Sequence, residues 1–322
     1  MSDDAGTRGN GAPVVAGIDI GGTKISAVLT DEAGSVLARG VVPAPAREGG
    51  TAMADAAAEL VLGLCAEHGV PLAGAGVGAA GVIDQERGVV VAASATFADW
   101  SGFPLAAELG DRLGAPVWIE NDVNAFLLGE LRWGAARGES DVLGIMLGTG
   151  VGGAIALDGA LHHGAHGAAG EIGHTPGYGD LVCTCGQTGH LETLASGTSI
   201  AKRYRSATGS AADAPEIADR ARAGEAEAAR VFADAARATA LAASTAASLV
   251  DLDMVVIGGG VHAAWDLLEP AIAETIRTDA PVSGFPLRIV RAEISADAVA
   301  LGAAALAAAR IADPAPTALA PA

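Results

Sequence analysis

Four metal-binding side chains lie close together in the second half of the chain. His174, Cys183, Cys185 and His190 fall within seventeen positions. Thiolates and imidazoles are the usual zinc ligands, and four of them close a tetrahedral site that keeps no open position. A disulfide between Cys183 and Cys185 would close a small, strained ring. The spacing therefore predicts a zinc site with a structural role.

An amide and a carboxylate follow one short apolar run. The run at residues 117–119 ends at Glu120-Asn121-Asp122, which precede an expected helix. Ligands of α/β proteins bind at the carboxyl ends of strands. There Asp122 could act as a general base toward a hydroxyl group, and Asn121 could hydrogen-bond a polyol. The competing interpretation is that either side chain caps the helix that follows.

Two glycine-rich turns each separate a pair of apolar runs, and a third glycine cluster follows a later run. The residues concerned are Asp19, Gly21, Gly22, Thr23 and Lys24, then Gly148, Thr149 and Gly150, then Gly258, Gly259 and Gly260. Backbone N–H groups in such turns can approach a phosphate because no Cβ intervenes. Asp19 could hold a hydrated Mg²⁺. A single turn of this kind indicates only a tight hairpin, but the three together favour phosphate binding.

The composition excludes several classes of protein. The 322 residues hold 19 Lys+Arg against 38 Asp+Glu, a formal net charge of −19, and contain no basic run. We therefore expect neither a nucleic acid nor a membrane surface as partner. A chain that is 51% hydrophobic and 18% charged is not disordered. Three cysteines, no secretory signal and no long apolar run predict a cytoplasmic protein.

Extended and helical patterns alternate along the chain, which is typical of an α/β fold. Strands of a first block are predicted at residues 14–20, 24–29, 36–42, 73–78 and 117–119. Strands of a second block are predicted at residues 141–147, 152–157, 254–257 and 287–290. Helices are predicted at residues 51–68, 105–113, 124–133, 214–250, 263–277 and 296–309. Each block begins with a glycine hairpin, which indicates a duplicated plan.

The same patterns predict how the chain divides. We expect a disordered N-terminus at residues 1–13 and a flexible tail at residues 311–322. Between them we expect a smaller α/β lobe at residues 14–120, completed by a C-terminal helix at about 295–310. A larger α/β lobe at residues 121–294 would carry the zinc loop.

The motifs occur in one fixed order that resembles a known family. The order is Asp19 to Lys24, the glycine turn at 76–81, Glu120 to Ala125, the turn at 148–153, Gly170-Glu171-Ile172-Gly173-His174, and Cys183-Thr184-Cys185-Gly186-Gln187-Thr188-Gly189-His190-Leu191-Glu192. Together they resemble the ROK family of bacterial sugar kinases and repressors, from about residue 14 to about residue 310.

The resemblance implies the actin-like ATPase (ribonuclease H-like) fold, in which two α/β lobes flank a cleft for sugar and ATP. Asp122 matches the family's catalytic base. The two glycine hairpins match its phosphate loops, and the glycines at 258–260 match its nucleotide-side turn. Its sugar-binding positions are matched by Asn121, Glu171, His174 and Glu192. The implied reaction is ATP- and Mg²⁺-dependent phosphorylation of a hexose, with C6 of glucose as the first choice.

One position departs from the family pattern. A third cysteine usually stands where this chain has His190. A Cys₂His₂ set remains sound for zinc, because imidazole replaces thiolate at tetrahedral sites. His174 in the family serves both zinc and sugar, which the two nitrogens of its ring allow.

Several alternatives stay open. N-acetylmannosamine, N-acetylglucosamine, mannose, fructose and allose fit the same side chains as glucose. A non-catalytic sugar sensor or regulator of the same family is an alternative of a different class. Only 13 residues precede Val14, so we expect no DNA-binding domain. The resemblance also implies a homodimer or homotetramer.

Overall fold

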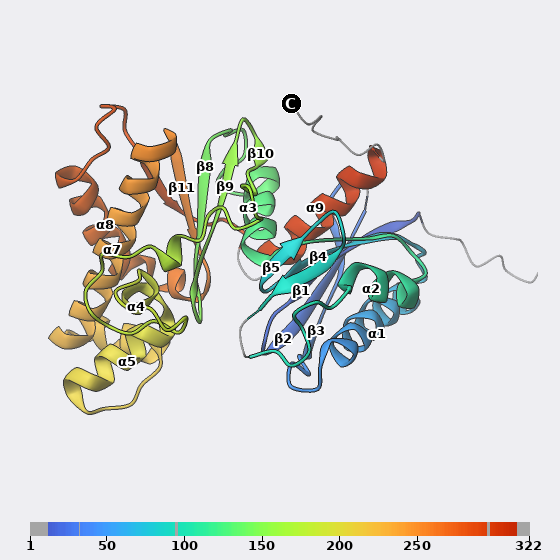
Figure 1. Ribbon diagram of the computed structural model, residues 1–322, viewed down its shortest axis with the longest axis horizontal. Coiled ribbons are helices and arrows are strands. Elements are labelled where there is room, and N and C mark those ends of the chain that lie inside the picture. Colours follow the sequence, from blue (N-terminus) through green and yellow to red (C-terminus); the bar gives the residue numbers. More distant parts are fainter. Residues whose placement is uncertain (1–11, 32, 94–95, 295–296, 314–322) are drawn as a thin grey trace, which may run out of the picture. The chain divides into compact units, whose positions relative to one another are not determined.

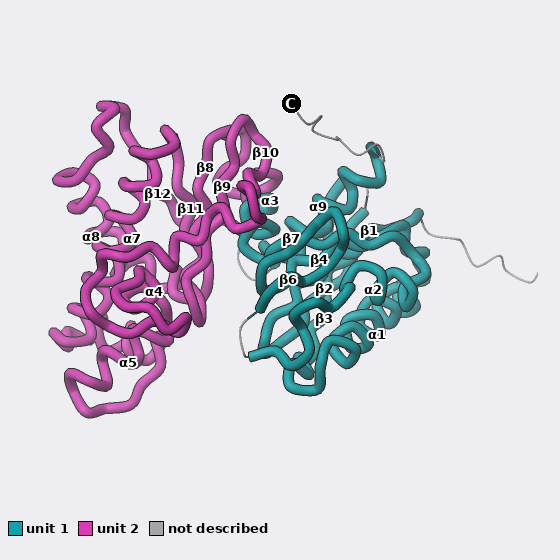
Figure 2. The backbone as a smooth tube through the Cα atoms, viewed as in Figure 1, with its two compact units in different colours: residues 1–129, 296–322 teal, residues 130–295 magenta. Residues whose placement is uncertain are grey.

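The computed structural model describes residues 12–31, 33–93, 96–294 and 297–313 (Figure 1). The chain divides into two compact units (Figure 2): unit 1 is residues 1–129 with 296–322, and unit 2 is residues 130–295. The predicted N-terminal and C-terminal tails lie mostly outside the described residues. Helix α9 (Ala298–Ala312) includes residues 311 and 312, which the sequence assigned to the tail.

Unit 1 is built on a five-stranded sheet with the order β3-β2-β1-β4-β7. β1 (Val14–Ile20), β2 (Lys24–Thr30) and β3 (Val36–Pro43) pair antiparallel in sequence. β4 (Leu72–Ala79) and β7 (Val117–Asn121) continue the sheet in parallel on the other side of β1. The parallel pairs need long crossovers, which contain α1 (Gly50–His68) and α2 (Leu105–Leu113).

The two faces of this sheet are covered differently. Alternate residues of β1, such as Ala16 and Ile18, belong to a core shared with α1 and α2, whereas Val15 packs with α9. A Cβ on Gly17 would lie 1.8 Å from the backbone oxygen of Ala300 in α9. This strand position must therefore be glycine, because helix and sheet approach too closely for any side chain.

Unit 2 repeats the plan of unit 1. Its sheet has the order β10-β9-β8-β11-β12, again with two antiparallel pairs followed by two parallel ones. The strands are β8 (Val142–Leu147), β9 (Val151–Leu157), β10 (Ala160–Leu161), β11 (Met254–Gly258) and β12 (Arg288–Arg291). The α/β class and the duplicated plan are confirmed, and both glycine hairpins lie at equivalent places.

The helices of unit 2 gather around α7 (Ala226–Val250), an alanine-rich helix that packs against α4, α5, α6 and α8. Small side chains let the neighbouring helices approach closely and exclude water along most of its length. The neighbours are α4 (Glu192–Ala195), α5 (Gly197–Thr208), α6 (Ala214–Arg222) and α8 (Trp265–Thr278). One core joins these helices to the sheet residues Leu143, Ile145 and Val255.

One predicted helix needs correction, and a helix and a hairpin were missed. The single helix expected over residues 214–250 is two helices, because Gly224 has φ +92° and ends the first of them. Helix α5 was not predicted, and neither was the hairpin of β5 (Val82–Asp84) and β6 (Val89–Ala92). The hairpin strands are too short to produce a recognisable alternation.

The division between the units falls inside α3 (Asp122–Trp133), after Gly129. A boundary at residue 120 was predicted, at the end of the strand. Instead, the first turns of α3 pack within unit 1, where a Cβ on Gly129 would lie 2.7 Å from the backbone oxygen of Ala298 in α9. Asn121 and Asp122 therefore belong to unit 1.

Among the described residues, no helix combines the length and apolar character that crossing a membrane requires.

Candidate active site

The turn between β7 and α3 is held by the side chain of Asn121. Its Oδ1 accepts hydrogen bonds from the backbone N–H groups of Val123 (2.9 Å) and Asn124 (3.2 Å), and its Nδ2 donates to the backbone oxygen of Gly81 (3.0 Å). Asn121 thus caps α3, as the competing interpretation held. Its amide has a second N–H, which keeps one donor for a ligand.

Asp122 is the first residue of α3 and is half-buried. Its Oδ1 accepts a hydrogen bond from the backbone N–H of Val123 (3.0 Å). A carboxylate at a helix N-terminus is stabilised by the dipole and by the N–H groups there. The arrangement keeps Asp122 at the carboxyl end of a parallel strand, where ligands of α/β proteins bind.

A buried carboxylate that sequence reasoning left without a role supports this turn. Glu120 is 2% exposed. Its Oε1 accepts hydrogen bonds from Gln85 Nε2 (3.1 Å), the backbone N–H of Asn121 (2.8 Å) and Asn124 Nδ2 (2.9 Å). Gln85 lies in the connection between β5 and β6, so the missed hairpin contributes to the position of Asp122.

The first glycine turn joins β1 to β2 and carries charged groups. Asp19 is near the end of β1, and its Oδ2 accepts a hydrogen bond from the Ser26 hydroxyl (3.4 Å). Burial raises the pKa of Asp19 to about 6, against the opposing effects of the Lys24 charge and the Ser26 hydroxyl. Burial disfavours the charged form of this carboxyl, and a nearby cation would favour that form. Asp19 is therefore suited to hold a cation. Thr23 and Lys24 are exposed at the turn.

The second glycine turn joins β8 to β9 and is held by neighbouring segments. The backbone oxygen of Gly148 accepts a hydrogen bond from Gly197 N–H at the start of α5 (2.8 Å). Glu192 Oε2 accepts one from Val151 N–H (3.0 Å). A Cβ on Gly150 would lie 2.6 Å from the same carboxylate oxygen. Glu192, predicted as a sugar ligand, therefore also supports this turn.

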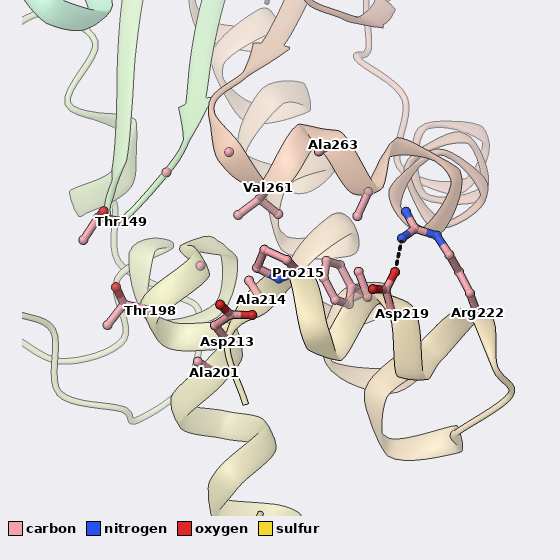
Figure 3. Close-up of a pocket in the computed structure, with 16 residues that line it drawn as sticks. Thr149, Thr198, Ala201, Asp213, Ala214, Pro215, Asp219, Arg222, Val261 and Ala263 are labelled. Carbon is pink, nitrogen blue, oxygen red and sulfur yellow. Dashed lines mark hydrogen bonds and ion pairs between the residues drawn. The ribbon is translucent and has the colours of Figure 1, made fainter. Parts of the chain in front are cut away.

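A pocket of about 560 Å³ opens beside the second turn, entirely within unit 2. This volume lies in the range of ligand sites. Figure 3 shows Thr149 and Thr198 at one side of the pocket and Asp219 and Arg222 at the other. Its apolar lining includes Ala201, Ala214, Pro215, Ala218, Phe232, Val261 and Ala264. Apolar walls with a few polar groups at the ends suit a nucleobase with its ribose.

The charged end of this pocket is paired internally. Arg222 donates to both carboxylate oxygens of Asp266 (2.9 and 2.8 Å) and to Asp219 (3.0 Å). These hydrogen bonds raise the pKa of Arg222 further above its ordinary value. The guanidinium thus ties α6 to α8 at the rim of the pocket.

The third glycine cluster has three different environments. Gly258 ends β11 and is buried. Gly259 has φ +83°, and a Cβ there would lie 2.6 Å from the backbone of Leu147. Only Gly260 lines the pocket. Of the three predicted nucleotide-side glycines, Gly260 reaches the pocket, Gly258 pairs with Met146 of β8, and Gly259 lies against the backbone of Leu147.

The four predicted zinc ligands come together. One ligand atom from each of His174, Cys183, Cys185 and His190 lies within 4.8 Å of all the others. Nδ1 of His174 is 3.7 Å from Sγ of Cys183, and Nδ1 of His190 is 3.3 Å from Sγ of Cys185. Ligands of a tetrahedral zinc lie about 3.3–3.8 Å apart. The set therefore fits zinc.

The second nitrogen of each histidine ring is also placed. Nε2 of His190 is 3.1 Å from Oε1 of Gln187, which can only accept a hydrogen bond, so Nδ1 is available for metal. Nε2 of His174 is 3.9 Å from Oε2 of Glu171. Glu171 is exposed, and His174 is half-buried. His174 thus turns one nitrogen to the cysteines and the other to the predicted sugar ligand Glu171.

Sequence reasoning missed the residues that line the pocket, apart from Gly148, Thr149 and Gly260. The available signal was Ser196-Gly197-Thr198, where the Ser196 hydroxyl accepts a hydrogen bond from Ser199 N–H and caps α5. No local pattern distinguishes the alanines of the pocket from those of the core. Thr184, whose hydroxyl donates to Glu192 Oε1 (2.6 Å), was quoted in a motif but given no role.

Two sheets of identical strand order, each with a glycine turn after its first strand, define the actin-like ATPase fold. A model of the ROK family matches residues 15–310. A glucokinase from Thermotoga maritima is 34% identical over 307 residues, which cover 90% of this chain and 96% of that protein. An N-acetylmannosamine kinase from Escherichia coli O157:H7 is 34% identical over 293 residues, which cover 90% of this chain and 97% of that protein.

Solved structures agree with these relatives. A ROK family glucokinase from Streptomyces griseus, in complex with glucose and AMPPNP, has a TM-score of 0.80 and 33% identity to this chain. The match covers 91% of this chain and 99% of that one. The chain belongs to the ROK family.

Proposed function

We propose that the protein phosphorylates a hexose with ATP, and that Asp122 is the general base. The observation that carries the proposal is the second glycine turn, from which Gly148 and Thr149 line a nucleotide-sized pocket. The class of enzyme is an ATP-dependent sugar kinase, in line with the ROK family and the relatives named glucokinase.

In the proposed reaction Asp122 accepts the proton of a sugar hydroxyl, most simply the primary hydroxyl at C6. The sugar oxygen forms a bond to the γ-phosphorus while the bond from that phosphorus to the β,γ-bridging oxygen breaks. ADP leaves with the electron pair of that bond. Catalysis of this kind depends on positioning and on neutralising charge, which is why a fixed carboxylate and fixed amides suffice.

The two glycine turns would bind the phosphates through backbone N–H groups, with Lys24 adding a positive charge. Mg²⁺, when bound, would neutralise phosphate charge. Asp19 is the carboxylate that fits it, since it lies near the end of β1 beside the first turn and its pKa is raised by burial. The pocket lined by Pro215 and Val261 would take the adenine ring.

His174, Cys183, Cys185 and His190 would hold a structural Zn²⁺, whose four protein ligands leave no position for substrate. Ordering this loop would fix the second nitrogen of His174 and the adjacent carboxylates of Glu171 and Glu192. Together with Asn121, these are the residues that we propose for binding sugar hydroxyls. A cytoplasmic location and a homodimer or homotetramer stay predictions.

Glucose is the first candidate for the sugar. N-acetylmannosamine is the second, because the Escherichia coli relative of that name matches this chain as completely as the Thermotoga maritima glucokinase does. The remaining hexoses named above complete the panel. A non-catalytic sugar sensor is the alternative of a different class, and it would bind hexose without releasing ADP.

The test is hexose-dependent ADP release by the wild type and by Asp122→Asn, with Asp111→Asn as a control on an exposed carboxylate of the same unit. We expect Asp122→Asn to lose at least about 100-fold in kcat, because removing a general base costs about that much or more. Asp111→Asn should match the wild type. A variant within about tenfold of wild type would show that Asp122 is not the base.

A further inference from the structure

The carboxylate of Glu192 is held at both oxygens by two different segments of unit 2. Its Oε2 accepts a hydrogen bond from Val151 N–H, next to the second glycine turn (3.0 Å). Its Oε1 accepts one from the hydroxyl of Thr184 (2.6 Å), in the loop that carries the metal ligands. The residue itself is 8% exposed. Two donors on opposite oxygens prevent the carboxylate from rotating.

Thr184 is the donor that would persist when zinc is bound. Sγ of Cys183 also lies 3.6 Å from Oε1 of Glu192 and can donate while it is a thiol. A zinc ligand is a thiolate and has no proton to donate. The Thr184 hydroxyl keeps its proton in both states.

The place of Thr184 in the chain links the hydrogen bond to the metal site. It stands between Cys183 and Cys185, so its backbone is fixed from both sides when those two residues share a metal. Thr184 is itself exposed, and no described contact makes it part of the core. Its hydroxyl lies 2.6 Å from Glu192 Oε1 and 3.9 Å from Cys183 Sγ, so Glu192 is its main acceptor.

We propose that Thr184 is a positioning residue that aims the Glu192 carboxylate at the sugar. This inference rests on the proposed function, in which Glu192 binds a sugar hydroxyl. Each carboxylate oxygen accepts more than one hydrogen bond, so Thr184 and Val151 leave acceptor sites for the substrate. Because the hydroxyl is carried by the metal loop, order imposed by the metal would reach the Glu192 carboxylate through this contact.

The test compares Thr184→Val, which keeps the shape but removes the hydroxyl, with Thr184→Ser, which keeps the hydroxyl. Thr188→Val is the control, since Thr188 is an exposed threonine of the same loop with no side-chain hydrogen bond among the described contacts. The measurements are zinc content per chain, hexose affinity by calorimetry without ATP, kcat, and the KM values of hexose and ATP.

We expect Thr184→Val to weaken hexose binding and raise the hexose KM about tenfold, because losing a hydrogen bond to a charged group costs about that factor or more in binding. Its kcat should stay within about threefold of the wild type, and zinc content and the KM of ATP should not change. Thr184→Ser and Thr188→Val should match the wild type in all measurements.

Two results would overturn the inference while leaving the proposed function intact. One is a Thr184→Val enzyme with wild-type hexose KM. The other is a variant that loses zinc, or whose KM for ATP rises as much as that for hexose, which would make Thr184 part of the loop's scaffold. A wild type that neither binds any hexose nor releases ADP with it would instead overturn the proposed function, and this inference with it.

Discussion

The two glycine turns occupy equivalent places in two sheets of the same strand order, yet they are built differently. In unit 1 the strand register pairs Ile20 with Ile25 across the turn, and in unit 2 it pairs Leu147 with Val151. Asp19 and Met146 each precede the last paired residue of their strand, so the two occupy equivalent positions. The first turn has an acid where the second has a neutral, half-buried side chain.

The second turn is held by a side-chain carboxylate and by two other segments of unit 2. Glu192 accepts from Val151 N–H, Gly197 donates to Gly148, and Gly259 lies against Leu147. At the first turn, the side chains of Thr23 and Lys24 are exposed, Gly21 N–H donates to the Lys24 carbonyl (3.1 Å), and the Thr23 carbonyl accepts from Ala44 N–H (3.0 Å). The hairpin of unit 1 thus carries the charged side chains Asp19 and Lys24, whereas the equivalent hairpin of unit 2 forms part of a pocket wall. Duplicated topology does not imply duplicated chemistry.

The largest expected effect is on kcat, and it distinguishes Asp19 from the equivalent residue Met146. Asp19→Asn should lower kcat by about 1000-fold, because a carboxylate that helps to hold Mg²⁺ supports several kcal/mol of charge stabilisation. Met146→Leu should stay within about threefold of the wild type, since it exchanges side chains of similar volume. Steady-state ADP release at saturating Mg²⁺ measures both. Equal losses in the two variants would mean that the equivalent positions share one structural role.

The second prediction concerns stability against pH. The folded-state pKa of Asp19, about 6, lies above the ordinary value of 3.8, so the folded state holds this proton longer than the unfolded state does. The stabilisation from Asp19 is complete below pH 3.8 and is lost as pH rises through about 6. In metal-free buffer, Asp19→Asn should therefore gain on the order of 3 kcal/mol relative to wild type between pH 4 and pH 8.

Urea denaturation at several pH values, with a chelator present, measures this difference. Met146→Leu again serves as the control, because it carries no titrating group and its difference from the wild type should not change with pH. A difference between Asp19→Asn and wild type that is flat from pH 4 to pH 8 would show that the Asp19 carboxyl ionises at its ordinary pKa.

The smallest expected effect compares one alanine substitution in each turn. A Cβ on Gly150 would lie 2.6 Å from Glu192 Oε2, so that the carboxylate must leave Val151. A Cβ on Gly22 would lie 2.9 Å from Cγ2 of Thr96, an exposed side chain that can shift. Gly150→Ala should lower the free energy of unfolding by about 2 kcal/mol, and Gly22→Ala by less than about 1 kcal/mol. The midpoints of urea denaturation measure both losses. A larger loss for Gly22→Ala than for Gly150→Ala would contradict the contrast between the turns.

Much of the fold could be predicted from the sequence because apolar runs and glycine turns are local signals. The hairpins after Ile20 and Leu147 and the helix at 51–68 needed no tertiary information. The break at Gly224 was missed because alanine-rich helical patterns continue on both sides of it. The β5–β6 hairpin was missed because its strands are only 3 and 4 residues long.

The candidate site was predicted unevenly for a related reason. The metal cluster could be predicted because zinc ligands are recognised by residue type and spacing, and the structure brings all four together. The nucleotide pocket could not, because its walls are mostly alanine, proline and glycine residues, many of them from α5, α6 and η2 (Gly260–Ala264). Such residues acquire a role only when separate segments meet around them.

The sequence by itself determined the family, the order of the glycine turns, the general base candidate and the four metal donors. Only the tertiary structure decided that Glu192 supports the second turn, that Glu120 supports the first turn of α3, and that Gly259 serves packing. The physical reason is distance along the chain. Glu192 and Val151 are 41 residues apart, and Gln85 and Glu120 are 35 apart, so their hydrogen bonds exist only after the strands and loops between them have folded.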